Sequence, residues 1–269
     1  MVLIYVIISL LIAYLLIRSK KNYFQDNQVL TLSVKRELLI CLVLIVLSYT
    51  SLELQRIKKD NFSGFEIGNL NQTTVDQING FDRGVAGRWD IQSKDRGKIL
   101  KNIAIYLIPF SVLLYAGGFR SRLILFFIFS EGYVLTEVLT GLAKGLVNRF
   151  RPFAYRTIDQ MQLLNVEAKE KFLEDIVEYD ILNSFFSGDA SIIAFAFVFF
   201  AYSFSVLYKE SKSRNAVWIV TLIVVVLGCY FRTMSGKHFP TDVLMGAIVG
   251  MLVAFGIVMI HKKTLKSNV

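Results

Sequence analysis

The sequence of 269 residues is poor in charge, cysteine and histidine, and each scarcity excludes a class of protein. Only 19% of the residues are charged and 54% are hydrophobic, whereas an average soluble domain has roughly 25% charged residues. This balance excludes an ordinary soluble domain. The two cysteines, Cys41 and Cys229, lie in apolar segments, so the sequence predicts neither a disulfide nor a metal cluster.

Long apolar segments are abundant instead, and each approaches the length of a membrane span, about 17–25 residues. The segments are residues 2–17, 38–52, 103–119, 123–147, 190–208, 216–231 and 243–260. They predict an all-α fold, a polytopic membrane helical bundle of about six to seven transmembrane helices. We expect residues 1–36 to form an N-terminal membrane anchor and a cytoplasmic loop, and residues 37–269 to form the membrane-embedded domain.

Basic residues gather in alternate loops, which predicts the orientation of the bundle. With seven spans, the basic clusters at residues 18–36, 120–122, 209–214 and 262–266 all fall on the cytoplasmic side. Residues 53–102, 148–189 and 232–242 then face outward. The net charge of +9 is partly this positive-inside signal, so we expect no nucleic acid partner.

The outward segment 53–102 is the longest polar stretch, and its residues 81–90 mix glycine, aromatic and charged residues. One interpretation is a short helix at the lipid–water boundary, with Trp89 at headgroup level. The other is a connecting loop without a role in substrate handling. The second polar stretch, residues 155–183, is expected to flank the site discussed next.

Three groups of polar residues stand at the ends of apolar segments. In the first group, Lys144 and Arg151 are seven residues apart and are expected to share one helix face, with Glu137 as a contact for Lys144. In the second, Ser187, Gly188 and Asp189 begin a predicted helix, whose first backbone N–H groups can bind an anion. Basic headgroup anchors and an ordinary helix cap are the alternatives.

The third group contains Arg232, His238 and Asp242, and His238 is one of only two histidines in the chain. Pro240 favours a helix start between His238 and Asp242. An aspartate bonded to one ring nitrogen would leave the other nitrogen free to attack an electrophile. The alternative is a histidine at the membrane interface and a helix acid that interacts with the helix dipole.

The order and spacing of the three groups resemble the type-2 phosphatidic-acid phosphatase superfamily over roughly residues 100–260. That family has Lys-x6-Arg-Pro, then Pro-Ser-Gly-His, then Ser-Arg-x5-His-x3-Asp. The first motif is complete here from Lys144 to Pro152, and the third departs only in having Phe231 at its leading serine. The resemblance implies the six-helix core of these lipid phosphatases.

It also implies the role of each residue. His238 resembles the nucleophile that forms a phosphohistidine, and Asp242 resembles its orienting partner. The implied cradle for the phosphoryl oxygens consists of Lys144, Arg151, Arg232, Ser187 and the N–H of Gly188. Cations that neutralise these oxygens are what phosphoryl transfer requires. The family works without a metal, and we expect no metal site and no cofactor.

The second motif departs from the family, because Phe186 replaces the proline and Asp189 replaces the histidine that protonates the leaving oxygen. An aspartic acid has an ordinary pKa of about 3.9 and is ionised at neutral pH. Three accounts are open. Burial raises the pKa of Asp189 enough for it to act as the acid, or the leaving group needs little help, as in a pyrophosphate, or turnover is poor.

The resemblance therefore implies an enzyme, a phosphatase that removes phosphate from a lipid phosphate or diphosphate at the outer, periplasmic face of a bacterial cytoplasmic (inner) membrane. Undecaprenyl pyrophosphate, lipid A, phosphatidic acid and phosphatidylglycerol phosphate are the substrates it suggests. The expected partners are this lipid and the bilayer. A lipid phosphotransferase that uses the same phosphohistidine and a weakly catalytic lipid-phosphate-binding protein are the alternatives.

Overall fold

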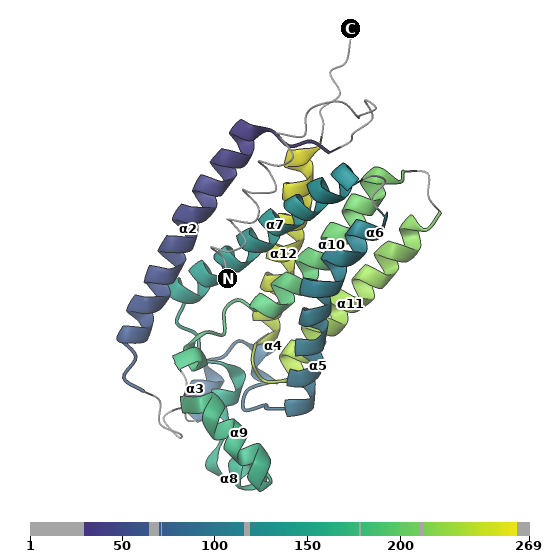
Figure 1. Cartoon of the computed structure of the whole chain (residues 1–269). Helices are drawn as coiled ribbons and strands as arrows, with labels where there is room; N and C mark the ends of the chain where they lie inside the picture. The colour runs from purple at the N-terminus through teal and green to yellow at the C-terminus, as the bar shows by residue number, and fades with distance from the viewer. Residues whose placement is uncertain are drawn as a thin grey trace.

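The computed structural model describes residues 30–64, 70, 72–115, 119–177, 179–209 and 212–262, and within them every regular element is helical. The long helices lie side by side as a bundle, and the short helices α3, α4, α8 and α9 gather at one end of it (Figure 1). The elements are α2 (Val34–Asp60), α3 (Gln72–Asp76), α4 (Gly80–Arg83), α5 (Ile91–Asn102), η1 (Ile103–Leu107), α6 (Ile108–Tyr115), α7 (Phe119–Leu146), η2 (Pro152–Tyr155), α8 (Ile158–Gln162), α9 (Val166–Val177), η3 (Tyr179–Leu182), α10 (Gly188–Leu207), α11 (Arg214–Met234) and α12 (Pro240–His261).

Five of these helices are long and apolar enough to cross a membrane, namely α2, α7, α10, α11 and α12. The chain is an integral membrane protein with the predicted all-helical bundle. The apolar segment at residues 2–17 lies outside the described residues. The segment at 103–119 differs from its expected form, because η1 and α6 continue from α5 as one helical run that ends at Tyr115.

Helix α10 lies at the centre of the bundle and is buried along almost its whole length, whereas α2 and α11 are mostly exposed. Exposed leucine, isoleucine and valine side chains cover both of these outer helices. In a bilayer such side chains meet lipid tails at little cost, since the tails are as apolar as the side chains.

Two glycines on one face of α12 let its backbone touch that of α10. A Cβ atom at Gly246 would lie 2.4 Å from the carbonyl oxygen of Ser187, and one at Gly250 would lie 2.1 Å from that of Ser191. Any larger residue would push the two helices apart, as in other small-residue helix contacts in membranes. The contact holds the start of α12 beside the start of α10, where two of the predicted motifs lie.

A small second core covers this end of the bundle and joins the two polar segments, residues 53–102 and 155–183. The ring of Trp89 packs edge-on against Phe172 of α9, with 5.7 Å between centroids, and Phe153 lies beside them. Helix α9 covers the ring of Trp89 and leaves only 8% of the residue exposed, so the ring packs on protein, and its level relative to the headgroups stays a prediction.

Candidate phosphate site

His238 lies in the short loop between α11 and α12 and is 2% exposed. Its Nδ1 atom is 2.6 Å from the carbonyl oxygen of Ser184, so Nδ1 carries a proton and donates it to this acceptor. The lone pair is then on Nε2, which faces Nη1 of Arg151 at 3.4 Å. The carbonyl thus sets both the tautomer and the orientation of the ring.

Asp242 does not take the direct contact with the ring that the sequence predicted. It is the N3 residue of α12, so its Oδ2 reaches back to the N-cap amide of Phe239 at 2.9 Å and also accepts a bond from Ser184 Oγ at 2.5 Å. Its Oδ1 pairs with Arg149. Asp242 therefore contacts both the residue after His238 and the serine whose carbonyl holds the ring.

Arg151 reaches the site from an extended segment, and the expectation that it shares a helix face with Lys144 is wrong. Helix α7 ends at Leu146, and the amide of Arg151 bonds to the carbonyl of Ile181 at 2.9 Å. The guanidinium donates to the carbonyl of Lys237 at 2.9 Å and to Oδ2 of Asp180 at 2.6 Å.

Lys144 remains in the last turn of α7 and interacts electrostatically with Arg151 and Asp180. Its interaction with Glu137 is of the same long-range kind and is not an ion pair. Burial alone would raise the pKa of Asp180, but the positive charges of Arg151 and Lys144 outweigh it and hold that pKa well below its usual range. Asp180 is therefore a permanent counter-charge to these cations.

The second motif forms the N-terminus of α10. Ser187 is its N-cap and accepts a bond from the amide of Ala190 at 3.4 Å, and Gly188 packs so closely on Thr140 that a Cβ atom would lie 2.8 Å from a methyl group. Asp189 forms ion pairs with Lys101 of α5 at 3.0 Å and with Arg232 of α11 at 3.1 Å. The two cations favour the ionised carboxylate.

The positive charges of all three cationic motif residues act on the imidazole of His238. Burial lowers the pKa of His238 well below its ordinary value, and the charges of Arg151, Arg232 and Lys144 lower it further, while the bond to Ser184 opposes them in part. The ring is therefore neutral near pH 7. A neutral imidazole among three cations is an arrangement that would accept an anion.

Asp82, in the segment 53–102, is a buried part of this site that sequence reasoning missed. It is 0% exposed and accepts bonds from Arg149 at 2.6 Å and from the amide and hydroxyl of Thr241 at 3.0 and 2.6 Å. Burial raises its pKa, but hydrogen bonds from Thr241, Asn79 and Arg149 outweigh burial and lower it. The only local signal is the pair Asn79 and Asp82, which caps the four-residue helix α4.

Arg149 joins Asp82 to Asp242 and lies over the ring of Phe239, 4.4 Å from its centroid. Because Phe239 follows His238 directly, this contact of Arg149 helps to hold the loop in place. Residues 53–102 thus contribute Asp82 to the surroundings of the His238 loop, and the interpretation that this segment has no role in substrate handling stays a prediction.

Lys58 of α2 explains where α7 ends. Its ammonium donates to the carbonyls of Lys144 at 2.7 Å, Val147 at 3.0 Å and Leu182 at 3.1 Å, and to Asn183 at 2.8 Å. A cation here satisfies carbonyl groups that a helix C-terminus leaves without partners. The same contacts hold the segment of Arg149 and Arg151 beside residues 182 and 183.

These features define an integral membrane protein with a buried, cation-lined histidine site at one end of a helical bundle. Residues 124–266, more than half of the chain, match the PAP2 superfamily, and the chain belongs to that superfamily.

A more specific relative is the bacitracin transport permease protein BcrC of Bacillus licheniformis, which is 30% identical over 122 residues. The match covers 45% of this chain and 48% of that protein, so it spans about half the length of the relative. No solved structure matches the chain.

Proposed function

We propose that the protein is a membrane lipid phosphatase that cleaves a lipid diphosphate through a phosphohistidine on His238. The observation that carries the proposal is the imidazole itself, with Nδ1–H bonded to the carbonyl of Ser184 and Nε2 directed toward Arg151. A nitrogen nucleophile needs a free lone pair and a positioned phosphorus. Here the tautomer is set before the substrate arrives.

In the first step, Nε2 of His238 attacks the terminal phosphorus and the bond to the bridging oxygen breaks. The lipid monophosphate leaves with the bonding electron pair. In the second step, water attacks the phosphohistidine, the P–N bond breaks, and inorganic phosphate is released. Arg151, Arg232 and Lys144 would neutralise the phosphoryl oxygens in both steps, together with the N–H of Gly188 at the start of α10.

Asp189 supports the choice of a diphosphate. Its carboxylate pairs with Lys101 and Arg232, and protonation would weaken both ion pairs. A residue held in this way is poorly suited to protonate a leaving alkoxide. A diphosphate avoids the need, since the phosphate that leaves is already a stable anion. Of the lipids suggested above, undecaprenyl pyrophosphate is the diphosphate.

The alternation of basic loops supports an outward, periplasmic site in a bacterial inner membrane. Lys262 follows α12 directly, whereas His238 precedes it, so the basic tail and the site lie at opposite ends of that helix. A soluble reporter that modifies an engineered cysteine in place of the exposed Glu167, on α9 at the same end of the bundle as the site, from outside intact cells, would test the orientation.

The central test is phosphate release by the purified full-length protein from undecaprenyl pyrophosphate and from a monophosphate lipid. We expect release from the diphosphate and none from a His238→Ala variant, with Glu167→Gln on the exposed face of α9 as the control. Labelled terminal phosphate should be trapped on the protein in an acid-labile form. Release by His238→Ala at the normal rate would refute the proposal.

A weakly catalytic binding protein is the second candidate, because Asp189 replaces the usual acid. It predicts saturable lipid binding without release at any pH. Label that moves to an added acceptor lipid instead of water would assign a phosphotransferase.

A further inference from the structure

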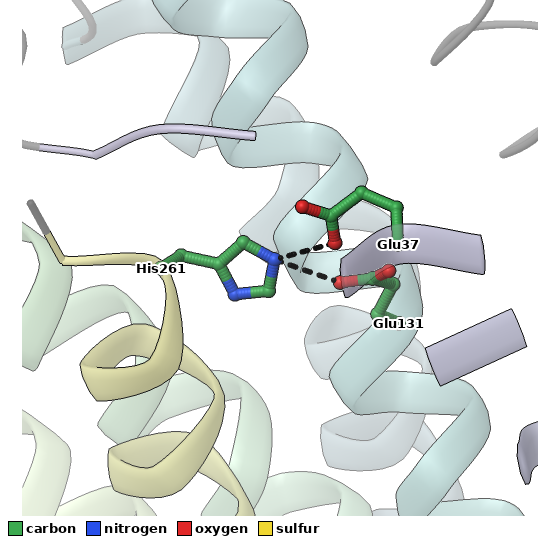
Figure 2. A group of neighbouring side chains, drawn as sticks. All are labelled: Glu37, Glu131 and His261. Atoms are coloured by element: carbon green, nitrogen blue, oxygen red, sulfur yellow. Dashed lines mark hydrogen bonds and ion pairs between the residues drawn. The ribbon is translucent and has the colours of Figure 1, made fainter. Parts of the chain in front are cut away.

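A second cluster of buried ionisable side chains lies at the other end of the bundle. Glu37 of α2, Glu131 of α7 and His261 of α12 face one another there (Figure 2). A helix of the length of α12 spans about 33 Å, and the loop of His238 precedes its first residue while His261 is its last. The cluster is therefore separate from the phosphate site.

The geometry of His261 is that of a metal ligand. Its Nδ1 lies 2.7 Å from the carbonyl oxygen of Ile257, which accepts the ring proton and leaves a lone pair on Nε2. Such a second contact commonly orients a metal-binding imidazole. Nε2 lies 3.1 Å from Oε2 of Glu37 and 3.2 Å from Oε2 of Glu131. Two ligands about 2.1 Å from a tetrahedral ion are themselves about 3.4 Å apart, so little adjustment is required.

Glu131 is the residue whose surroundings call for a cation. It is 2% exposed, its Oε1 accepts no hydrogen bond from any described residue, and its Oε2 has only Nε2 of His261 close by, at 3.2 Å. A buried carboxylate without such bonds is costly. With the lone pair on Nε2, a cation among the three side chains would be the group that satisfies both carboxylates.

Glu37 has one oxygen already occupied and one directed into the cluster. Its Oε1 accepts bonds from Arg36 at 2.6 Å and from the amide of Ser33 at 2.8 Å. Its Oε2 faces His261. Arg36 also donates to the carbonyl of Ile260 at 2.9 Å, so the start of α2 is bound to the end of α12. These bonds hold the carboxylate in position before any ion arrives.

We propose that Glu37, Glu131 and His261 bind one divalent transition-metal ion, of the class of Zn²⁺ or Mn²⁺. An imidazole nitrogen with carboxylate oxygens suits these ions, whereas Ca²⁺ and Mg²⁺ prefer oxygen ligands alone. Two carboxylates balance the double charge of the ion. The bound ion joins α2 to α7 and α12. This proposal differs from the sequence-based expectation of no metal site, because the three side chains come from distant segments with no recognisable spacing.

The test uses the full-length protein without a histidine tag, purified in detergent and freed of metal with a chelator. Zn²⁺ and Mn²⁺ content after dialysis is measured by elemental analysis, and Co²⁺ serves as the spectroscopic probe. We expect one ion per chain, visible Co²⁺ bands of a nitrogen–oxygen site, and a higher melting temperature with metal. Glu131→Gln, which keeps the shape of the side chain, should weaken binding by at least the 10–100-fold typical of lost supporting groups.

Glu137→Gln is the matched control, because it alters another glutamate of α7 outside the cluster and should leave metal binding unchanged. His261→Ala should lose the Co²⁺ bands. The proposal is overturned if the wild-type protein binds no stoichiometric Zn²⁺, Mn²⁺ or Co²⁺, which would assign the cluster to a protonated imidazole between two carboxylates. It is equally overturned if Glu131→Gln binds metal as tightly as the wild type. Neither result depends on phosphatase activity.

Discussion

Replacing Gly236 with alanine tests whether the segment at residues 79–90 holds the loop of His238 in place. Gly236 has a φ of +71°, a conformation that costs an L-residue about 1–2 kcal/mol. A Cβ atom there would lie 1.8 Å from the carbonyl oxygen of Arg88, which is backbone and cannot rotate away. The backbone segments of Gly236 and Arg88 must then move apart by about 1.6 Å to regain ordinary contact.

His238 is two residues beyond Gly236, so a shift of this size reaches the imidazole. Misplacing a reacting group by 1 Å can cost about 100-fold in rate, and we expect a loss of kcat of about that size. Overpacking of this kind destabilises a protein by about 1–3 kcal/mol in addition to the cost of the backbone conformation. Phosphate release and the melting temperature in detergent measure the two effects separately.

Gly84→Ala is the control, because Gly84 lies in the same segment with a φ of −64° and no atom within 4 Å of an added Cβ. It should keep activity within about twofold. If Gly236→Ala also keeps its activity within twofold, the proposed bracing of the His238 loop is refuted. If the Gly236→Ala variant melts at the temperature of the wild type but has no activity, the substitution acts on the position of the His238 loop and not on global stability.

Three further predictions concern the charged groups. Because the pKa of His238 is lowered and the neutral ring is the nucleophile, kcat/KM should stay level well below pH 6.5 and fall only as the pH drops through the lowered value; an acid limb at or above 6.5 would contradict this. Asp82→Asn removes one of the two carboxylates that hold Arg149, so it should lower the free energy of unfolding by up to about 3–5 kcal/mol and reduce kcat. The control is Asp90→Asn, which keeps its helix cap and should not reduce kcat. Asp189→Asn should cost less than about tenfold on a lipid diphosphate, since loss of a true general acid costs about 100-fold or more, and a large gain in turnover for Asp189→His would favour the weakly catalytic binder.

Sequence patterns predicted the parts of the site that depend on local chemistry. Ser187 caps α10 and Pro240 begins α12, as a serine before an apolar run and a proline in a first turn predict. These two helix starts place Gly188 and Asp242 without any knowledge of the tertiary structure. The all-helical membrane bundle follows from composition in the same way.

Contacts between distant segments could not be predicted in this way. Gly145 stands in the last turn of α7, but glycines also occur inside this helix, and its end at Leu146 depends on the contacts of Lys58 from another helix. A helix continued through residue 151 would direct Arg149 away from the face of Lys144 and Arg151, but α7 ends at Leu146 and its periodicity no longer applies there. Asp82 and Lys101 lie in a polar stretch with no local sign that they face the motifs.

The contact of Gly246 and Gly250 with α10 has a consequence for how substrate preference can change. Where Gly246 and Gly250 meet the start of α10, the two backbones touch and no side chain separates them. A change of lipid must therefore be accommodated by residues of α5, α7 and α11, which meet α10 through their side chains. Mutagenesis aimed at a new lipid headgroup should therefore begin with the residues of these three helices that face α10, and it should leave Gly246 and Gly250 unchanged.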